Sequence, residues 1–221
     1  MIDSGAVPQL DGDYRWKAAQ MERMLAGLIS DERKARARVL EVGCGPVGIV
    51  SRLPWGERHA VDPLNDFFQG HPTLSQCRDP SVHYQKAMGE ELPFDPAMFD
   101  LVVLENVLDH VQGAPRLLGE VGRVLKEDGV LYLTVNVRTP WGVALHSVLS
   151  RLLIDKGHPY SFTASSLRQL VRRQGFSIKR EQLEDHRRAR ASDRRSRFWK
   201  DRIKGFTGLS EFVLSGVLSK A

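Results

Sequence analysis

The stretch that decides the fold is LEVGCGPVGI, residues 40–49, in which three glycines and a proline follow a short apolar run. A strand that runs into Gly-x-Gly places a tight turn at the carboxyl edge of a parallel sheet, and glycine lets a ligand approach the bare backbone. In open α/β sheets this edge is where ligands bind. Gly43, Gly45 and Gly48 also complete the G-x-G-x-x-G pattern of dinucleotide sites, so the pattern alone leaves NAD open.

Strands and helices are predicted to alternate around this turn, at the spacing of βαβ units. The predicted strands are 38–43, 59–62, 82–86, 99–106, 130–136, 177–183 and 210–221. The predicted helices are 14–30, 115–129 and 163–176, the last two stopped by Gly129 and Gly175. The pattern predicts an α/β fold: one doubly wound, mostly parallel seven-stranded sheet with helices on both faces.

Composition is that of an ordinary globular chain. Its 221 residues are 42% hydrophobic and 27% charged, and we expect a single domain over 1–221 with an N-terminal helical segment at 1–35. The formal charge of +5 does not by itself indicate a nucleic-acid partner, and no nucleic-acid-binding module accompanies it. Cys44 and Cys77 make no disulfide framework, and we find no signal peptide or membrane span, which predicts a cytoplasmic protein.

Two carboxylates lie beside the glycine turn, and the first of them favours a cationic ligand over a pyrophosphate. Glu41 lies in the strand two residues before Gly43, where it would face a cation and repel a phosphate. Asp62 ends the next predicted strand, where a carboxylate can accept both hydroxyls of a ribose, a feature shared with NAD sites. Two longer segments complete the pattern: GEELPFDPAMFDLVVLENVLDHV (89–111) and RVLKEDGVLYLTVN (123–136).

In the order and spacing of these motifs the chain resembles a class I S-adenosylmethionine-dependent methyltransferase with a Rossmann-like fold, of the small-molecule group that includes the ubiquinone-biosynthesis type. The resemblance covers roughly 36–180 and implies S-adenosylmethionine as cofactor. The cofactor-binding residues that it implies are Glu41, Gly43, Cys44, Gly45, Asp62, Pro63, Met88, Gly89 and Glu105. Glu41 and the turn backbone would hold the methionine end, and Asp62 the ribose.

The remaining implied contacts include two departures from the family pattern. Pro63 would flank the adenine, and Glu105 would lie beside the methionine moiety. Met88 stands where members usually have an Asp that contacts the adenine amino group, so the backbone of Met88 and Gly89 would serve instead. Val47 stands where many members have a third glycine. Cys44 is interpreted as a small loop residue and not as a nucleophile.

His110 is the candidate catalytic residue. It follows the predicted strand 99–106 on the edge that should face the substrate, and an imidazole with a pKa near 6.5 can take a proton from a hydroxyl or an amine. The alternative is that it only braces its loop. No spacing of His and carboxylates predicts a metal site.

Two segments are candidate substrate-side insertions, 139–162 and 186–205. The first carries an apolar helical stripe, which could equally pack on the core or on a second subunit. The second holds nine Lys or Arg against two Asp over 186–204. It is interpreted either as a solvated loop or as a docking surface for an anionic or lipid-linked acceptor or a membrane. Phe198 and Trp199 favour a membrane interface or a stacking contact.

The predicted function is methyl transfer to a small-molecule acceptor, on an oxygen atom by family frequency. One alternative is an NAD(P)-dependent oxidoreductase, although the chain lacks the Tyr-x-x-x-Lys pair of short-chain reductases. The other alternative is a non-catalytic binding protein that keeps the fold. Met88 and Val47 are the residues that keep this second alternative open. The sequence predicts no particular oligomeric state.

Overall fold

The computed structural model describes residues 6–153 and 160–221. The described residues form a seven-stranded sheet in the order β3-β2-β1-β4-β5-β7-β6. The strands are β1 (Arg38–Val42), β2 (Glu57–Val61), β3 (Val82–Gln85), β4 (Phe99–Glu105), β5 (Leu125–Val137), β6 (Phe176–Leu183) and β7 (Phe212–Lys220). All neighbouring strands are parallel except β7, which runs antiparallel to β5 and β6. This confirms the predicted, mostly parallel sheet.

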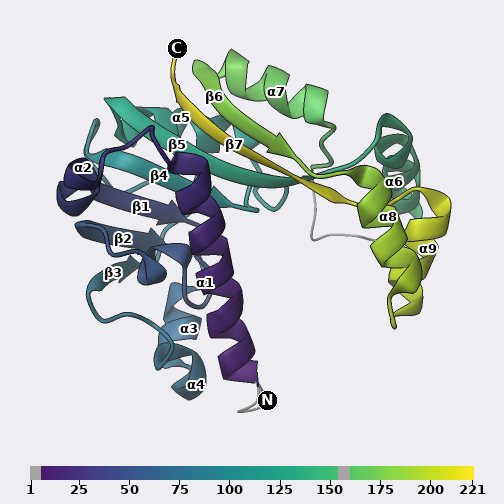
Figure 1. The fold of residues 1–221 in the computed structure, drawn as a ribbon, viewed down its shortest axis with the longest axis horizontal. Helices are drawn as coiled ribbons and strands as arrows, with labels where there is room; N and C mark the ends of the chain where they lie inside the picture. The colour runs from purple at the N-terminus through teal and green to yellow at the C-terminus, as the bar shows by residue number, and fades with distance from the viewer. Residues whose placement is uncertain (1–5, 154–159) are drawn as a thin grey trace.

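Helices cover both faces of this sheet (Figure 1). They are α1 (Ala6–Leu25), α2 (Asp31–Arg36), the 3-10 helix η1 (Ile49–Arg52), α3 (Asn65–Gly70), α4 (Pro72–Ser75), α5 (Ala114–Val124), α6 (Pro140–Leu153), α7 (Ala164–Arg173), α8 (His186–Arg195) and α9 (Trp199–Thr207). None of the helices in the described part of the chain has the length and hydrophobicity to cross a membrane.

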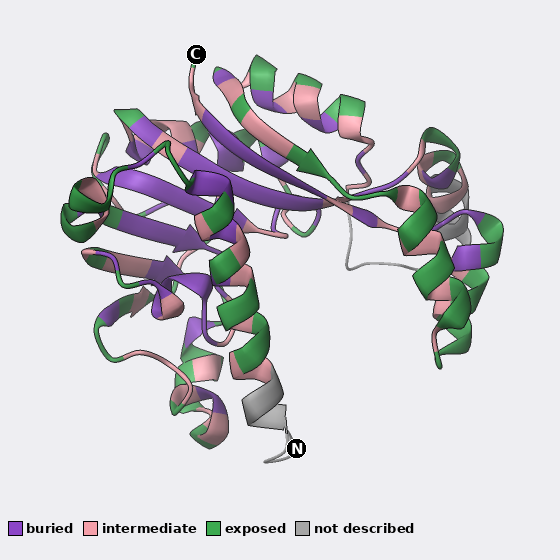
Figure 2. Ribbon diagram, in the orientation of Figure 1, coloured by how far each residue is buried: buried purple, intermediate pink, exposed green. Residues whose placement is uncertain are grey.

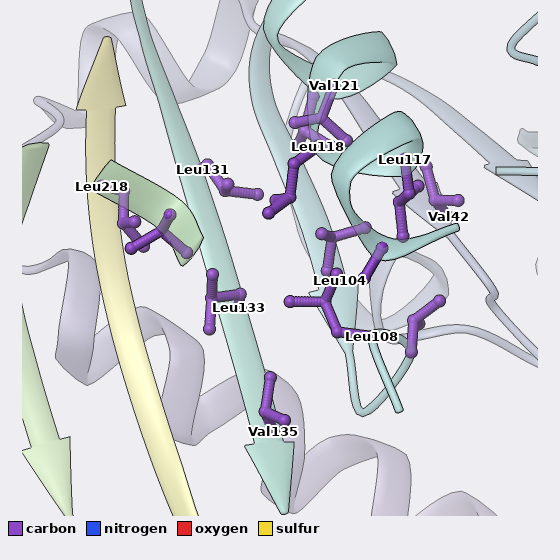
Figure 3. Packing of buried hydrophobic residues seen from close by; sticks show 14 of the residues in the cluster. Val42, Leu104, Leu108, Leu117, Leu118, Val121, Leu131, Leu133, Val135 and Leu218 are labelled. Atoms are coloured by element: carbon purple, nitrogen blue, oxygen red, sulfur yellow. The ribbon is translucent and has the colours of Figure 1, made fainter. Parts of the chain in front are cut away.

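Two hydrophobic clusters form because the central strands are apolar on both faces. On β4, six consecutive residues from Phe99 to Leu104 are buried, as expected for a strand enclosed in a parallel sheet. Alternate residues point to opposite faces. Leu104 belongs to the cluster with α5 and α7 that Figure 3 shows in part, and Val103 belongs to the cluster under α1 and η1. The carboxyl ends of β1, β2 and β4 are therefore fixed by packing from both sides.

The N-terminal helical segment differs from the predicted single helix 14–30. Helix α1 begins at Ala6 and ends at Leu25, and Gly27 then takes a left-handed φ of 76°. Ser30 starts α2 by accepting a hydrogen bond at Oγ from the Arg33 backbone N–H at 3.3 Å. Serine is a favoured N-cap residue because its oxygen satisfies an otherwise unpaired helix N–H.

The expectation that Gly129 stops a helix was wrong. Helix α5 ends at Val124, and Leu125 is already extended and buried as the first residue of β5. Gly129 lies within that strand and does not have a positive φ. A Cβ at this position would lie 2.8 Å from the Leu125 side chain and 2.9 Å from the Lys126 carbonyl oxygen. Glycine is required at position 129 because a side chain there would clash with Leu125 and Lys126.

The basic segment is helical, so its interpretation as a solvated loop was wrong. Asp185 caps α8 by accepting from the Arg187 backbone N–H at 2.8 Å, and the chain turns at Ser196 into α9. Gly205 lets the two helices meet, because a Cβ there would lie 2.8 Å from the Arg194 backbone nitrogen. The Gly205 carbonyl oxygen accepts from Arg194 Nε at 3.0 Å.

Helices α6, α8 and α9 gather beyond the ends of β5, β6 and β7, away from α1 (Figure 1). We call these three helices the lobe. The buried Arg138, just before α6, donates to the Leu209 carbonyl oxygen at 2.9 Å and pairs with Glu211. Trp141 Nε1 donates to the Thr207 carbonyl oxygen at 3.3 Å. The start of the first predicted insertion is therefore tied to the carboxyl end of α9, just after the second. Residues 154–159 of the first insertion lie outside the described part of the chain.

Candidate functional site

The turn after β1 contains three glycines whose backbone φ angles are positive. Gly43, Gly45 and Gly48 have φ values of 72°, 60° and 85°, which L-residues with a side chain rarely adopt. The third residue with a positive φ is Gly48 and not Val47. The glycine that the family pattern has at position 47 is thus replaced by one at position 48, which allows the turn. A Cβ on Gly43 would lie 2.7 Å from Val107 Cγ2. The turn thus has no room for side chains at its first position.

Glu41 lies inside the protein behind this turn. Its side chain is 1% exposed, and Oε2 accepts a hydrogen bond from the Val50 backbone N–H at 2.9 Å, at the start of η1. Burial raises the pKa of Glu41 to about 7, while the hydrogen bond from Val50 acts in the opposite direction. A Cβ on Gly48 would lie 2.9 Å from Glu41 Oε2. The carboxyl group therefore fixes the turn from within, and its role toward a ligand stays a prediction.

Asp62 connects the ends of β1 and β2. Its Oδ2 accepts from the Gly45 backbone N–H at 2.9 Å, and its Oδ1 accepts from the Leu64 backbone N–H at 2.8 Å. A carboxylate has about four lone-pair positions, so each oxygen can still accept a ligand hydroxyl. The predicted ribose carboxylate is placed beside the glycine turn, as the sequence led us to expect.

The predicted adenine segment lies at the neighbouring strand ends. Pro63 and Leu64 are exposed after β2, and Met88 is half exposed after β3. Gly89 is buried, and a Cβ there would lie 2.7 Å from Leu117 Cδ1 and 3.0 Å from Val42 Cγ1. Gly89 therefore brings the chain close to the end of β1. Leu64 and Met88 offer apolar side chains to a flat ring, with the backbone left as the source of polar contacts.

Tyr14 of α1 reaches the glycine turn, a contact that the sequence did not predict. Its hydroxyl donates to the Cys44 carbonyl oxygen at 3.3 Å and would be 3.2 Å from a Cβ on Gly45. Burial raises the pKa of the Tyr14 hydroxyl and of the Cys44 thiol. A thiol with a raised pKa is a poor nucleophile, which agrees with the interpretation of Cys44 as a loop residue. No local motif in the sequence marks Tyr14.

A pocket of about 240 Å³ opens beside the turn, between α1 and the strands β4 to β7. Its lining residues are mostly polar. They are Trp16, Lys17, Gln20, Glu105, Asn106, Tyr132, Thr134, Asn136, Gln182, Glu184, Val213 and Ser215. Of these, Glu105 was a predicted site residue. The pocket residues from α1 and β6 were not predicted. They reach the pocket only through tertiary packing, that of α1 against the sheet and that of β6 beside β7.

Glu105 and Asn106 form one wall of this pocket. Thr134 Oγ1 donates to Glu105 Oε2 at 2.8 Å, and Lys17 Nζ lies 3.3 Å from Glu105 Oε1. Asn106 has a left-handed φ of 56°, a conformation that Asn adopts more readily than most residues. Its Oδ1 accepts from the Asn136 backbone N–H at 3.2 Å. Every one of these side chains is held by a neighbour, so the wall is preorganised.

His110 lies apart from this wall, in the segment between β4 and α5. Its side chain is 43% exposed, and its Nε2 is 3.8 Å from Oδ2 of the buried Asp109. It does not line the 240 Å³ pocket. The role of His110 as a base therefore stays a prediction. Within the described ranges, no group of three or more His, Cys, Asp or Glu side chains is arranged to hold a metal ion.

Residues 15–181 match the family model described as a methyltransferase domain. The malonyl-[acyl-carrier protein] O-methyltransferase of Geobacter sulfurreducens is 29% identical over 179 residues, which are 74% of this chain and 66% of that protein. The thiol S-methyltransferase TMT1B of Homo sapiens is 33% identical over 139 residues, 61% of this chain and 56% of that protein. The chain thus spans between half and two thirds of the length of these relatives.

The fold is also similar to solved structures. The geranyl diphosphate C-methyltransferase of Streptomyces coelicolor, in complex with Mg²⁺, geranyl diphosphate and S-adenosyl-L-homocysteine, superposes with a TM-score of 0.66 at 14% identity. The match covers 94% of this chain and 80% of that one. At this identity the likeness supports the fold alone. The family match gives no support to an oxidoreductase. The chain belongs to the methyltransferase-domain family, with the fold of the class I S-adenosylmethionine-dependent methyltransferases.

Proposed function

We propose that this chain transfers a methyl group from S-adenosylmethionine to an oxygen atom of a small, hydroxyl-bearing acceptor. One observation carries the proposal: Glu105, which lines the polar pocket, lies at the end of the strand next to the glycine turn. Val42 pairs with Leu104 across β1 and β4, so Gly43 and Glu105 follow at the same level of neighbouring strands. Glu105 also lines the pocket. A cofactor on the turn would therefore have its reactive end at the pocket wall.

The residues of the turn fit this cofactor. Gly43 and Gly45 carry no side chains of their own where the methionine end would lie, and Asp62 offers carboxylate oxygens for the ribose hydroxyls. Leu64 and Met88 are exposed apolar side chains for the adenine. The bound cofactor supplies an activated methyl group on a sulfonium. The protein's own contribution is then to place the acceptor in line with that methyl group, which can provide much of the rate.

The pocket favours an uncharged, hydroxylated acceptor. It contains the carboxylates Glu105 and Glu184 and one ammonium, that of Lys17, which is paired with Glu105. Its excess of negative charge would repel an anion that entered it. The amide groups of Asn106 and Gln182 can orient a hydroxyl by hydrogen bonds. A thiol forms only weak hydrogen bonds, so the same wall would orient it poorly.

The choice of oxygen over sulfur needs an experiment, because the similar proteins include an O-methyltransferase and a thiol S-methyltransferase. The purified protein would be incubated with S-adenosylmethionine labelled on the methyl group, and with catechol or dithiothreitol as probe acceptors. We expect label in the methyl ether of catechol. Dithiothreitol also carries hydroxyls, so the labelled atom would be identified in the product. Preferential labelling of a dithiothreitol sulfur would overturn the oxygen assignment. Binding of S-adenosylhomocysteine without transfer to either probe would favour the non-catalytic alternative.

A further inference from the structure

Exposed apolar side chains gather on one face of α9. Trp199, Ile203 and Phe206 are 67%, 47% and 64% exposed. Spacings of four and three residues place them on one side of a helix. Figure 2 shows α9 exposed along most of its length at the outer end of the lobe. Such a stripe is not needed for packing within the lobe, and so it calls for a separate explanation.

The opposite side of α9 is already occupied. Gly205 is buried against α8, where the Arg190 and Arg194 side chains both donate to its carbonyl oxygen, at 3.2 and 3.0 Å. Asp201 Oδ2 accepts from Ser196 Oγ at 2.8 Å, which fixes the start of the helix. Because α8 holds this side, the apolar stripe faces away from the protein.

Two further aromatic residues extend the stripe. Phe198, 55% exposed, precedes α9 and lies under the Arg197 guanidinium, 4.7 Å from the ring centre. Trp141, 64% exposed, is tied to the carboxyl end of α9 by its hydrogen bond to Thr207. We define the α9 face as Trp141, Phe198, Trp199, Ile203 and Phe206. Tryptophan with phenylalanine and an aliphatic residue is the composition of interfacial helices.

Positive charge is concentrated around the α9 face. Nine of the chain's 32 Lys and Arg and two of its 27 Asp and Glu lie within 186–204, so this segment carries +7 and the rest of the chain −2. Lys200 and Arg202 flank the stripe on either side at helical spacing. The Arg194 guanidinium lies 5.3 Å from the Phe206 ring centre. The chain is therefore polarised, with its net positive charge at the same end as the aromatic residues of the α9 face.

We propose that the α9 face docks on an anionic lipid bilayer. In an interfacial helix the apolar side chains enter the boundary between headgroups and acyl chains, while the Lys and Arg heads stay with the anionic headgroups. A convex stripe on a single helix, bordered by long flexible cations, suits a bilayer. A folded acidic protein would have to offer a matching apolar groove. The proposal is independent of the methyl acceptor, since it concerns a surface outside the pocket.

Co-sedimentation of the full chain with vesicles tests the proposal. We expect binding to mixed phosphatidylcholine and phosphatidylglycerol vesicles and much weaker binding to phosphatidylcholine alone. Each cation near an anionic surface contributes roughly fivefold to the partition coefficient. Arg195→Gln/Arg197→Gln/Arg202→Gln should therefore lower it on the order of 100-fold. The matched control is Arg36→Gln/Arg172→Gln/Arg173→Gln, exposed arginines outside the lobe, which should change it less than about twofold.

A second triple variant tests the apolar stripe. Trp199→Ser/Ile203→Ser/Phe206→Ser should lower the partition coefficient by about tenfold or more, since apolar area no longer leaves water. Leu28→Ser/Phe67→Ser, exposed apolar residues elsewhere, is its control and should bind like the unaltered protein. Circular dichroism would check that each variant is folded.

Tryptophan fluorescence gives a readout that needs no triple variant. Lipids brominated on the acyl chains should quench the emission of the unaltered protein, and Trp199→Phe should lose a large part of that quenching. Three results would overturn the proposal. They are no binding of the unaltered protein to anionic vesicles at low salt, binding like that of the unaltered protein by the Arg195/Arg197/Arg202 and Trp199/Ile203/Phe206 variants, and binding without quenching. The last result would mean electrostatic adhesion with no docked apolar face.

Discussion

The Asp62 carboxylate accepts a hydrogen bond from the Gly45 backbone N–H at 2.9 Å, so the carboxylate predicted to hold the ribose also fixes the glycine turn. The second oxygen accepts from Leu64, beside the expected adenine position. The Asp62 side chain thus connects three parts of the predicted cofactor site: the glycine turn, the ribose position and the adenine position. Loss of Asp62 should affect binding both directly and through the shape of the turn.

Asp62→Ala should weaken the binding of S-adenosylhomocysteine by about 1–3 kcal/mol, because the ribose hydroxyls lose a charged acceptor. Isothermal titration calorimetry measures this change. Asp66→Ala, which removes an exposed carboxylate paired with Lys86, is the matched control and should leave affinity unchanged. Equal affinities for Asp62→Ala and the unaltered protein would contradict the ribose assignment.

Gly43→Ala should destabilise the protein more than Gly27→Ala does. Both glycines have similar φ values, 72° and 76°, so alanine would be strained at either position by about 1 kcal/mol. Only at Gly43 would the new Cβ also meet Val107, 2.7 Å away, while Gly27 has open space around it. We expect an additional loss of about 1–3 kcal/mol at Gly43, measured by denaturant unfolding. Equal losses of stability in the two variants would mean that Val107 moves away from the new Cβ at no cost in free energy.

Glu41 should make the protein less stable as the pH rises. Burial raises its pKa from 4.5 to about 7 in the folded state, so between these values the folded protein binds more protons than the unfolded chain. The stability that this group contributes is present below about pH 4.5 and is lost toward pH 7. The free energy of unfolding decreases by at most about 3 kcal/mol over this range. Glu41→Gln cannot titrate, so its stability relative to the unaltered protein should rise by roughly this amount from pH 5 to pH 8.

Glu120→Gln is the matched control for this titration. The Arg123 side chain lowers the pKa of Glu120, so its contribution changes only below its ordinary pKa of 4.5. The stability difference between Glu120→Gln and the unaltered protein should therefore be the same at pH 5 and pH 8. Chemical denaturation at the two pH values measures both variants. A constant difference for Glu41→Gln as well would show that the Glu41 carboxyl is already charged at pH 5.

The strands and the glycine turn could be predicted because their signals are local. The run from Phe99 to Leu104 is apolar except for Asp100, and Gly43 and Gly45 lie directly after β1 in the chain. Residues that reach the site through tertiary packing could not be predicted in this way. Tyr14 and Lys17 come from a helix whose position depends on the whole sheet, and nothing near them in the sequence marks them as site residues.

In the basic segment, the high density of charge led to a loop interpretation although other residues of the segment favour a helix. Asp185 is a good N-cap, and Ala and Arg after it are strong helix formers, so α8 was encoded in its own residues. The density of charge favoured a loop interpretation instead. What charge density does not reveal is Gly205, whose missing side chain lets α9 pack on α8. The Arg190 and Arg194 side chains both donate to the Gly205 carbonyl oxygen.

His110 provides the test of base catalysis. Its imidazole, with the side chain 43% exposed, follows β4 at the edge of the sheet that carries the turn. If it removes the proton of the acceptor hydroxyl, His110→Ala should lower kcat by about 100-fold while the affinity for S-adenosylhomocysteine stays the same. The pH dependence of kcat/KM should then lose the limb that titration of the base produces.

A purely structural His110 would behave differently. His110→Gln keeps a side chain that can donate and accept hydrogen bonds but cannot titrate near neutral pH. If the imidazole only braces the segment before α5, this variant should restore both activity and thermal stability relative to His110→Ala. If His110 is the base, it should restore stability alone, and kcat should stay low. Full activity in both variants would exclude His110 from the reaction and leave placement of the acceptor beside Glu105 as the main contribution of the protein.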